Sequence, residues 1–343
     1  MVILINVALL SRWHVHADSY ARQANQDNNL SIQLVWDEDT ARGRDWADEL
    51  GVPFESELES VLQNPNIDAV IVCTPTNLHK EVIMKAAKHQ KHIFTEKVLA
   101  FTVEDCQEIY DVVEAFNVHL MVSLPHVIKA NYLYAQQIVD QELLGEITML
   151  RCRKAHNGAV PQEDQSTGWL PEHFFDQETC GGGSFIDLGA HPIYLTNRLA
   201  GPAKSICARL QTQSDKYEVD DNAVAIIEYT SGAIGVVEAS FMSHGSPFQL
   251  ELYGTAGTLL IENNHIRLKT KQTGDDWIEP EEQINTLPTP LEQWVNAITH
   301  NQQSSITKED IVNLSRINQA ATLSNQQEKK VYIEEIIGGK SHV

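Results

Sequence analysis

A glutamate and a lysine stand together at the end of a predicted buried strand. The apolar run of residues 92–95 is followed directly by Glu96 and Lys97. An ammonium group in such a position must be paired or hydrogen-bonded, because an unpaired charge is costly to bury. Glu96 is the obvious local partner. Taken alone, the pair is also compatible with a surface lysine whose stem lies along the protein while its head reaches water.

A carboxylate and an imidazole follow a glycine-rich segment in the second half of the chain. Residues 181–183 are all glycine, and Asp187 and His191 come next, four residues apart. The glycines allow a close backbone approach, and the spacing places both side chains on one face if the segment is helical. Together they suit the binding of a hydroxyl group and the transfer of its proton near neutral pH. A buried Asp/His pair at a helix N-terminus in a domain interface is an equally good interpretation.

The turn after the first predicted strand lacks the glycine pattern G-x-G-x-x-G of a dinucleotide-binding fold. Ser11, Trp13 and His16 occupy the three glycine positions. Those glycines normally allow a tight turn and a close approach of the backbone to a pyrophosphate, and the indole of Trp13 would fill that space. The helix N-terminus remains, and Arg12 adds a positive charge. Dinucleotide binding at this turn is therefore weakened as a hypothesis without being excluded.

Two histidines in the same turn raise the question of a metal ion. His14 and His16 are separated by one residue and would face different sides of a helix. The sequence shows no carboxylate or cysteine pattern beside them, so they make a poor metal site. We therefore predict no metal, with a structural or substrate-facing role for these side chains. One functional hypothesis is nevertheless metal-assisted isomerisation by these and other histidines. It predicts metal in the purified protein.

A carboxylate follows the second predicted strand. Asp37 comes directly after the apolar residues 34–36. Here a carboxylate can accept hydrogen bonds from the ribose hydroxyls of adenosine and would repel a 2′-phosphate, which favours NAD over NADP. The same residue, or Glu38 or Asp39 after it, could instead cap the next helix.

The helices and strands that must position these residues are predicted to form two domains. The first domain covers residues 1–122. Short apolar runs alternate there with segments of helical period, which predicts βαβ units and a Rossmann α/β domain with a doubly wound parallel sheet. The predicted strands are residues 3–10, 31–36, 69–74, 92–95 and 119–122. The predicted helices are residues 15–25, 40–50, 57–63, 77–89 and 103–116. Such a sheet binds ligands at the carboxyl ends of its strands.

Residues 123–343 are predicted to form an α+β domain with a mostly antiparallel open sheet, used for substrate binding and oligomerisation. The expected strands are residues 147–154, 203–213, 223–229, 233–241, 248–253 and 258–262, with a possible last strand at 330–334. The expected helices are residues 126–143, 290–300 and 308–325. Turns at residues 230–232 and 254–257 join neighbouring strands, with glycine supplying the positive φ that such turns need.

The composition limits the partners and the compartment. The 343-residue chain has 47 acidic and 25 basic residues, a formal net charge of −22, and no basic cluster, which argues against a nucleic-acid partner. No run reaches the ~20 apolar residues of a membrane span. Residues 2–10 lack the basic start and the cleavage site of a signal peptide. The five scattered cysteines contain no C-x-x-C pair, which favours a reducing, cytoplasmic compartment over a disulfide framework.

Four motifs, in order along nearly the whole chain, resemble one family. They are Thr74-Pro75-x-x-x-His79, Glu96-Lys97, Gly-Gly-Gly-x-x-x-Asp187-x-Gly189-x-His191 and Gly254-Thr255-x-Gly257. No single motif is decisive, but their conjunction is similar to the glucose-fructose oxidoreductase/inositol dehydrogenase/rhizopine-catabolism (Gfo/Idh/MocA) family. The resemblance implies a Rossmann domain and an α+β domain whose open sheet commonly serves for assembly, here as a homodimer or homotetramer. It also implies NAD(P)-dependent oxidation or reduction of a sugar, inositol or related polyol.

The same resemblance implies roles for individual residues. Lys97 would hydrogen-bond the reacting oxygen, Asp187 would bind substrate hydroxyls, and His191 would act as the general acid/base. The residues expected beside the cofactor are Ser11, Arg12, Trp13, His14, Asp37, Thr74, Pro75, Asn77, His79, Glu96 and Lys97. His126 and Trp169 are the further substrate candidates. Trp169 lies in residues 155–179, where aromatic and polar side chains suit a carbohydrate-like ligand but equally a packed lid.

Two departures separate the chain from the family pattern. Val98 stands where the family usually has a proline, so we expect the backbone after Lys97 to lose a fixed φ and the cis bond that a proline allows. The missing glycines raise an alternative function, a relative with weakened catalysis that acts as a ligand-sensing or partner-binding protein. Retention of Lys97, Asp187 and His191 favours the enzyme, because a binding module has no chemical need of all three.

Overall fold

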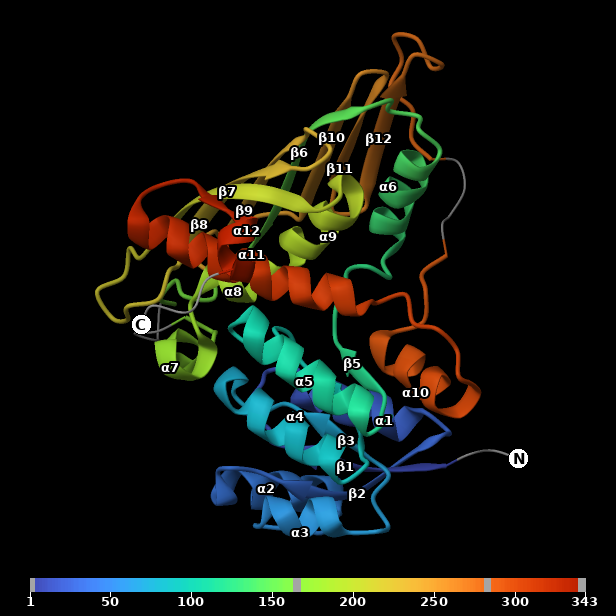
Figure 1. Cartoon of the computed structure of the whole chain (residues 1–343), viewed down its shortest axis with the longest axis vertical. Helices are drawn as coiled ribbons and strands as arrows, with labels where there is room; N and C mark the ends of the chain where they lie inside the picture. The colour runs from blue at the N-terminus through green and yellow to red at the C-terminus, as the bar shows by residue number, and fades with distance from the viewer. Residues whose placement is uncertain (1–3, 163–167, 281–284, 339–343) are drawn as a thin grey trace. The chain divides into compact units, whose positions relative to one another are not determined.

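The chain forms two compact units, which the computed structural model describes over residues 4–162, 168–280 and 285–338 (Figure 1). The first unit contains Met1–Pro125 together with Pro288–Thr307. The second contains His126–Leu287 together with Lys308–Val343. The sequence placed the boundary after residue 122 and gave all later residues to the second domain. The structure instead returns residues 288–307 to the first unit.

The first unit is built on a five-stranded parallel sheet in the order β2-β1-β3-β4-β5. Its strands are β1 (Ile5–Leu10), β2 (Leu30–Trp36), β3 (Ala69–Val72), β4 (His92–Thr95) and β5 (Leu120–Val122). Its helices are α1 (Ala17–Gln26), α2 (Thr40–Leu50), α3 (Leu58–Gln63), η1 (Thr76–Leu78), α4 (His79–Lys88), α5 (Val103–Ala115) and α10 (Pro290–His300). Helices α4 and α5 pack on each other, and α1 packs on α10. The predicted parallel α/β class is confirmed.

The strand order of this sheet fixes where its polar turns meet. Strand β1 lies between β2 and β3, so the chain reverses its winding direction at β1. Open sheets of this kind bind ligands beside such a reversal, at the carboxyl ends of the strands. The turns after β1 and β3 are neighbours, because the backbone N–H of His14 donates to the carbonyl of Cys73 at 3.1 Å.

Helix α10 belongs to the first unit although it comes late in the sequence. Thr289 and Glu292 form a capping box, and Pro290 is the first helical residue, where its missing N–H is not needed. Trp294 on this helix has no exposed surface. Its ring lies 5.8 Å from that of Phe94 on β4, and its indole N–H donates to the carbonyl of His119 at 3.4 Å. The helix therefore covers the sheet next to the strand that carries Glu96 and Lys97.

The second unit is built on an eight-stranded sheet in the order β12-β11-β10-β6-β9-β8-β7-β13. All neighbouring strands are antiparallel except β6 and β9. The strands are β6 (Ile147–Ala155), β7 (Ala203–Gln211), β8 (Asn222–Tyr229), β9 (Ile234–Ser240), β10 (Gln249–Gly254), β11 (Gly257–Glu262), β12 (His265–Thr270) and β13 (Val331–Tyr332). The predicted mostly antiparallel class is confirmed.

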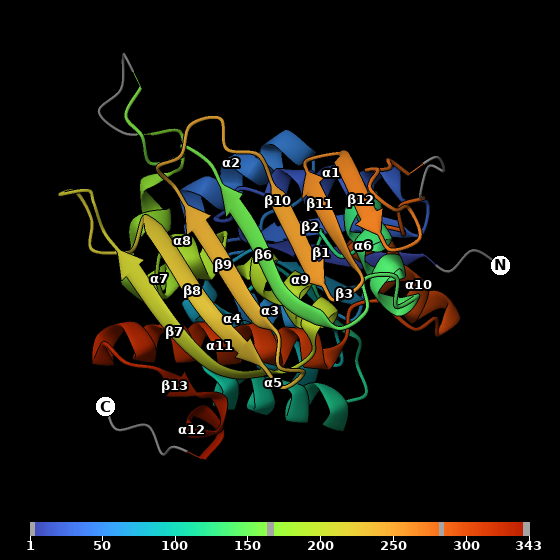
Figure 2. The ribbon, with the colours of Figure 1, turned by 90° about the horizontal axis from the view of Figure 1, so that it is seen from above.

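Helices of the second unit cover one face of its sheet (Figure 2). They are α6 (Ala130–Asp140), η2 (Glu172–Phe175), α7 (Gln177–Cys180), α8 (Ser184–Asp187), α9 (Ala190–Ala200), α11 (Lys308–Gln327) and α12 (Ile333–Gly338). Helix α9 packs on β6 and α11 on β7. On the other face, Val224 and Ile226 are 39% and 50% exposed, while Ala225 and Ile227 between and after them are buried. This alternation is that of a sheet with one open face.

Several details differ from the sequence prediction. Helix α9 was not among the expected helices, and the possible last strand at residues 330–334 is the shorter β13, followed by α12. The long helix expected over residues 126–143 is only α6, because Lys129 before it is extended and Glu142 after it has a positive φ of 55°. Strand β12 was not predicted, since only Leu268 and Thr270 in it are buried. At the turns, Gly232 has the expected positive φ of 91°. Gly254 does not, and is needed because a Cβ there would lie 2.2 Å from the carbonyl oxygen of Leu144.

The membrane and disulfide questions have direct answers for the described part of the chain. No helix in it is long and apolar enough to cross a membrane. The five cysteines are all free thiols.

We predict that Trp294→Ala strongly destabilises the protein. The substitution empties a fully buried site between α10 and β4, which typically costs about 3–5 kcal/mol. Urea unfolding followed by circular dichroism measures the change. Trp277→Ala is the matched control, because Trp277 is 44% exposed, and its unfolding free energy should change by no more than about 0.5 kcal/mol. Equal effects of the two substitutions would contradict the assignment of α10 to the core of the first unit.

Candidate functional site

The turn after β1 has the conformation of a glycine turn although it contains no glycine. Ser11 has a φ of 76°, in the left-handed region that glycine normally occupies. Its hydroxyl accepts the backbone N–H of Trp13 at 3.1 Å and donates to Glu38 at 3.0 Å. Trp13 is only 7% exposed, so its indole is packed within the protein, and that it fills the space of a pyrophosphate stays a prediction. The side chain of Ser11 thus closes the turn where a glycine would leave it open.

Asp37 at the end of β2 is fixed by several donors at once. Its side chain is fully buried and accepts the backbone N–H of Arg12 at 2.8 Å and of Asp39 at 2.8 Å. Arg42 on α2 donates to both carboxylate oxygens of Asp37, from Nη2 to Oδ1 at 2.6 Å and from Nε to Oδ2 at 3.0 Å. The alternative of Asp37 as a helix cap does not hold, because the residue that caps α2 is Asp39.

Two arginines near this turn, Arg12 and Arg42, form ion pairs with carboxylates of the protein. Arg42 also pairs with Glu38 at 2.6 Å, while burial, together with the charge of Asp37, raises the pKa of Glu38. The guanidinium of Arg12 binds Asp18 and Glu49, each at 2.9 Å. The positive charge of Arg12, which the sequence analysis offered to a pyrophosphate, is therefore balanced by carboxylates of the protein itself.

The turns after β3 and β4 carry buried polar groups that suit a ligand at this edge of the sheet. Burial lowers the pKa of His79, whose Nδ1–H donates to the carbonyls of Val98 and Leu99 at 3.0 and 3.3 Å. The hydroxyls of Thr74 and Thr95 are buried and have no hydrogen-bond partner among the described residues. Buried polar atoms are normally paired, so two such hydroxyls at the carboxyl ends of β3 and β4 fit a polar ligand there.

The remaining residues of this edge differ in exposure. Pro75 is buried and Asn77 on η1 is exposed, so of the two only Asn77 can reach a ligand from solvent. Lys97 is 6% exposed. The peptide bond between Lys97 and Val98 is cis, so the expected loss of a cis bond with the proline is wrong.

Glu96 interacts with Lys97, as expected, and with further groups. Its Oε2 accepts the backbone N–H of Lys97 at 3.2 Å. Its Oε1 accepts from His16 Nδ1 at 2.7 Å and lies 3.7 Å from His14 Nδ1. The premise that no carboxylate stands near the two histidines is therefore wrong, because the fold brings Glu96 to them from 80 residues away.

The electrostatics of Glu96 follow from these contacts. Glu96 is 2% exposed. Burial alone would raise its pKa, but the positive charge of His14, His16 and Lys97 outweighs burial and holds the pKa well below its usual range. The hydroxyl of Tyr20 hydrogen-bonds the same Oε1 and lies 2.9 Å from Ser123 Oγ. Burial raises the pKa of Tyr20, with the charge of Glu96 adding to it.

In the second unit, His191 and His126 lie together. Their ring centroids are 4.5 Å apart, and both residues are buried. Tyr194, one turn along α9, hydrogen-bonds His191 Nδ1 at 2.8 Å and accepts the backbone N–H of His126 at 3.2 Å. Lys129 Nζ lies 3.4 Å from His126 Nε2. Desolvation, and then the charge of Lys154, lower the pKa of Lys129.

Asp187 and His191 belong to two short helical segments that nearly join. Asp187 ends α8 and His191 is the second residue of α9. Leu188 and Gly189 between them keep right-handed helical dihedral angles, so the predicted four-residue spacing along a helix is found. A Cβ on Gly189 would lie 2.3 Å from the carbonyl oxygen of Phe185, which explains the glycine by packing.

The last of the three glycines and the first two residues of α8 surround a buried carboxylate. Asp220 accepts the backbone N–H groups of Gly183 and Phe185 at 3.0 and 2.8 Å and the hydroxyl of Ser184 at 2.8 Å. A Cβ on Gly183 would lie 1.9 Å from the carbonyl oxygen of Asp220. Burial raises the pKa of Asp220, and these hydrogen bonds oppose that rise. The close approach expected of the glycines is thus to the protein itself.

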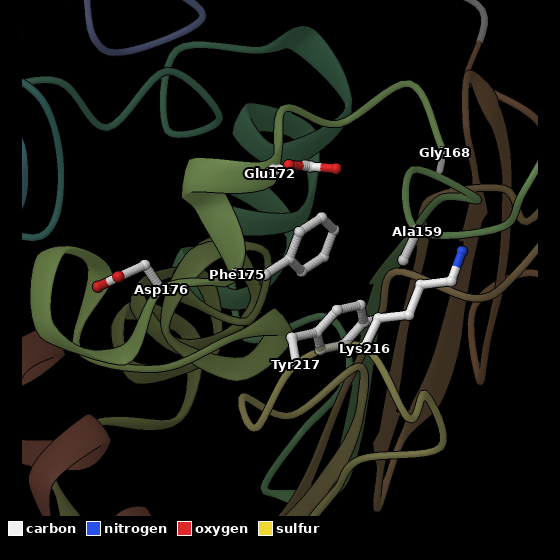
Figure 3. A pocket seen from close by; sticks show the side chains of 7 residues that line it. All are labelled: Ala159, Gly168, Glu172, Phe175, Asp176, Lys216 and Tyr217. Atoms are coloured by element: carbon white, nitrogen blue, oxygen red, sulfur yellow. The ribbon is translucent and has the colours of Figure 1, made fainter. Parts of the chain in front are cut away.

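A pocket of about 360 Å³ lies between residues of the segment 155–179 and two residues of a later loop (Figure 3). Its lining residues are Ala159, Gly168, Glu172, Phe175, Asp176, Lys216 and Tyr217. The rings of Phe175 and Tyr217 stack at 4.3 Å. Asp176 caps α7 by accepting the backbone N–H of Thr179 at 2.8 Å. Trp169 is 49% exposed and lies 4.7 Å from the ring of His156.

Sequence reasoning missed four residues of these clusters. They are Tyr20, Arg42, Lys129 and Tyr194. Tyr20 follows His16 by four residues, and Tyr194 follows His191 by three, so helical spacing carried a signal for both. Nothing in the sequence singles out Arg42 among the arginines as the partner of Asp37.

We predict that Asp220→Asn destabilises the second unit. One of the two oxygens that now accept three donors becomes an amide N–H₂, which leaves buried N–H or O–H groups unpaired at about 1–3 kcal/mol. Thermal and urea unfolding measure the loss. Asp275→Asn, at a fully exposed position 3.5 Å from Lys269, is the control and should unfold like the unmodified protein. An Asp220→Asn protein of unchanged stability would show that the glycine segment does not depend on this carboxylate.

Comparisons with known proteins agree with this architecture. A family model described as an oxidoreductase family with an NAD-binding Rossmann fold matches residues 14–124, and a GFO/IDH/MocA C-terminal domain model matches residues 132–260. Myo-inositol 2-dehydrogenase of Thermotoga maritima is 23% identical over 333 residues, 93% of this chain and 96% of that protein. An uncharacterized oxidoreductase of Streptococcus pneumoniae is 35% identical over 153 residues, 43% of this chain and 39% of that protein.

A solved structure provides a comparison of folds. Levoglucosan dehydrogenase in complex with NADH and levoglucosan has a TM-score of 0.79 and 21% identity to this chain, covering 96% of this chain and 98% of that one. At this level of identity the likeness establishes the fold.

Proposed function

The chain belongs to the GFO/IDH/MocA family of oxidoreductases, and from this premise we propose that it transfers a hydride between NAD and a CH–OH group of a sugar, inositol or related polyol. The relatives include a myo-inositol dehydrogenase, and a levoglucosan dehydrogenase shares the fold. Both names describe cyclic, hydroxyl-rich substrates. We infer the same substrate class for this chain.

The observation that carries the proposal is the arrangement around His191. Tyr194 holds the Nδ1 side of the buried ring at 2.8 Å, which fixes the orientation of the imidazole as a general base requires. We assign to His191 the proton of the reacting hydroxyl during oxidation, and the return of that proton during reduction. His126, 4.5 Å away, would support the ring and contact the substrate.

Lys97 and Asp187 complete the proposed machinery. The ammonium of Lys97 would donate a hydrogen bond to the reacting oxygen, and the carboxylate of Asp187 would accept hydrogen bonds from neighbouring hydroxyls. The nicotinamide, when bound, supplies the hydride acceptor or donor. Because Lys97 is only 6% exposed, its charge acts in a poorly hydrated setting, where hydrogen bonds to a developing negative charge are stronger than in water.

We propose NAD as the preferred dinucleotide. The carboxylates of Asp37 and Glu38 stand at the end of β2, where they would accept hydrogen bonds from a ribose and repel a 2′-phosphate. Arg42 neutralises part of that charge. The buried, unpaired hydroxyls of Thr74 and Thr95 support a polar ligand at the same edge of the sheet.

We predict that NADH binds with a dissociation constant below millimolar and more tightly than NADPH. Titration of the protein while following nicotinamide fluorescence measures both. Absence of binding by either nucleotide at millimolar concentration would overturn the dehydrogenase proposal. Binding of NADH without turnover of any sugar or polyol offered would favour the ligand-sensing alternative.

We predict that Lys97→Ala and His191→Ala each lower turnover by about 100-fold or more, because each removes a group that acts on the reacting oxygen or its proton. NADH affinity should stay within severalfold. Initial rates of NADH formation with myo-inositol and levoglucosan as trial substrates provide the readout. Lys85→Ala is the control, since Lys85 pairs only with the exposed Glu81 at 2.6 Å among the contacts of its ammonium in the described structure. If either catalytic substitution instead abolished NADH binding, the role of that residue would be structural.

A further inference from the structure

We propose that His14, His16 and Glu96 bind a divalent transition-metal ion of the zinc type in the first unit. The three side chains each offer one ligand atom, and these atoms all lie within 4.8 Å of one another. Neither the family assignment nor the proposed hydride transfer calls for a metal here. The inference rests on the side chains that the fold assembles at the start of α1.

The spacing of the donor atoms is close to what a metal requires. Tetrahedral zinc with bonds of about 2.0–2.1 Å places its ligand atoms roughly 3.3 Å apart. Glu96 Oε1 is 2.7 Å from His16 Nδ1 and 3.7 Å from His14 Nδ1, one distance below this value and one above it. His14 Nδ1 accepts the backbone N–H of His16 at 3.2 Å, a contact that a bound ion would displace. On binding, the ion would take the place of the proton that His16 Nδ1 now shares with Glu96, and that proton would leave to solvent.

The surroundings are those of a constructed site. Glu96 is 2% and His14 is 6% exposed. The hydroxyl of Tyr20 hydrogen-bonds the ligating oxygen of Glu96 and is itself beside Ser123 at 2.9 Å. Outer contacts of this kind orient metal ligands and raise affinity. The side chain of His16 is 46% exposed, which gives an ion a path from solvent.

The donor set selects the class of ion. Two imidazoles and one carboxylate suit zinc and other divalent first-row metals, whereas calcium and magnesium prefer oxygen ligands throughout. Three protein ligands leave at least one coordination position open, as in zinc sites that bind water or a substrate oxygen. A metal here would have its open position at the N-terminus of α1, where anionic groups of ligands also bind in this type of fold.

The test uses full-length protein without a histidine tag. Metal analysis of the purified protein and calorimetric titration with ZnCl₂ should give a stoichiometry near one, and saturating zinc should raise the melting temperature, because a ligand that binds the native state stabilises it. His16→Gln should weaken zinc binding by about tenfold or more and remove the stabilisation. It alters a partly exposed side chain and is expected to fold.

The matched control is His89→Gln. His89 pairs with Glu59 at 2.9 Å on the surface, so the substitution removes a comparable His–Glu contact without touching the cluster, and zinc binding should be unchanged. His14→Gln and Glu96→Gln, if folded by circular dichroism, should behave like His16→Gln. With Co²⁺ in place of zinc, intense visible absorption bands of a low-coordinate site should appear for the unmodified protein and be lost in His16→Gln.

Two results would overturn the proposal. One is zinc binding that is weak and equally present in His16→Gln. The other is the absence of zinc-dependent stabilisation in the unmodified protein, which would make the cluster an ion pair of the protein alone. None of these measurements uses a nucleotide or a sugar, so failure of the metal site and failure of the proposed dehydrogenase activity are separate outcomes.

Discussion

The carboxylate of Glu96 is 2% exposed in a chain with a net charge of −22, and the first unit has to compensate that charge where it stands. Burying an unpaired ion costs several kcal/mol. The compensation comes from the adjacent Lys97 and from His14, His16 and Tyr20, which lie at and after the turn that follows β1. A single buried charge therefore joins the end of β4 to the start of α1, the two places at which the sequence expected ligand chemistry.

This constraint gives a reason for the composition of the turn. Imidazoles are needed within reach of Glu96, and one of them, His16, occupies a position where related folds have glycine. The left-handed conformation that glycine would supply is adopted instead by Ser11, at a φ of 76°, and its hydroxyl hydrogen-bonds Trp13 and Glu38. Asp37 and Arg42 close the neighbouring end of β2. A dinucleotide binding here has to compete with contacts that the protein already makes to itself.

The second unit uses the same physical device. Asp220 is buried and accepts hydrogen bonds from Gly183, Ser184 and Phe185, which fixes the start of the segment that leads to Asp187 and His191. Satisfied buried networks of this kind hold neighbouring side chains in one arrangement. Each unit thus contains a buried carboxylate, Glu96 or Asp220, to which we assign no step of the hydride transfer. Each carboxylate fixes the backbone beside residues to which we do assign such a step.

Much of the fold could be predicted from the sequence, because helix caps and hydrophobic periodicity depend on residues that are close together along the chain. Helices α2 and α10 begin and end at the predicted residues, because an acidic N-cap and a capping box are local signals. The alternation of apolar strands with helical periods predicted a parallel sheet in the first half, and the motifs from Thr74 to Gly257 predicted the family. Residue type and spacing singled out Lys97, Asp187 and His191, and the family resemblance supplied their catalytic roles, which stay predictions.

Contacts between distant residues were decided by the tertiary structure. Glu96 meets His16 across 80 residues, and Asp220 meets Ser184 across 36. Periodicity reports only whether a position is buried, and with 47 acidic side chains in the chain it cannot say which one meets a given histidine or arginine. Trp294 likewise lies in a helix that the sequence analysis assigned to the second domain, yet it packs on Phe94 in the first unit. The sequence by itself determined which residues could do chemistry; the packing of the sheets determined which of them stand together.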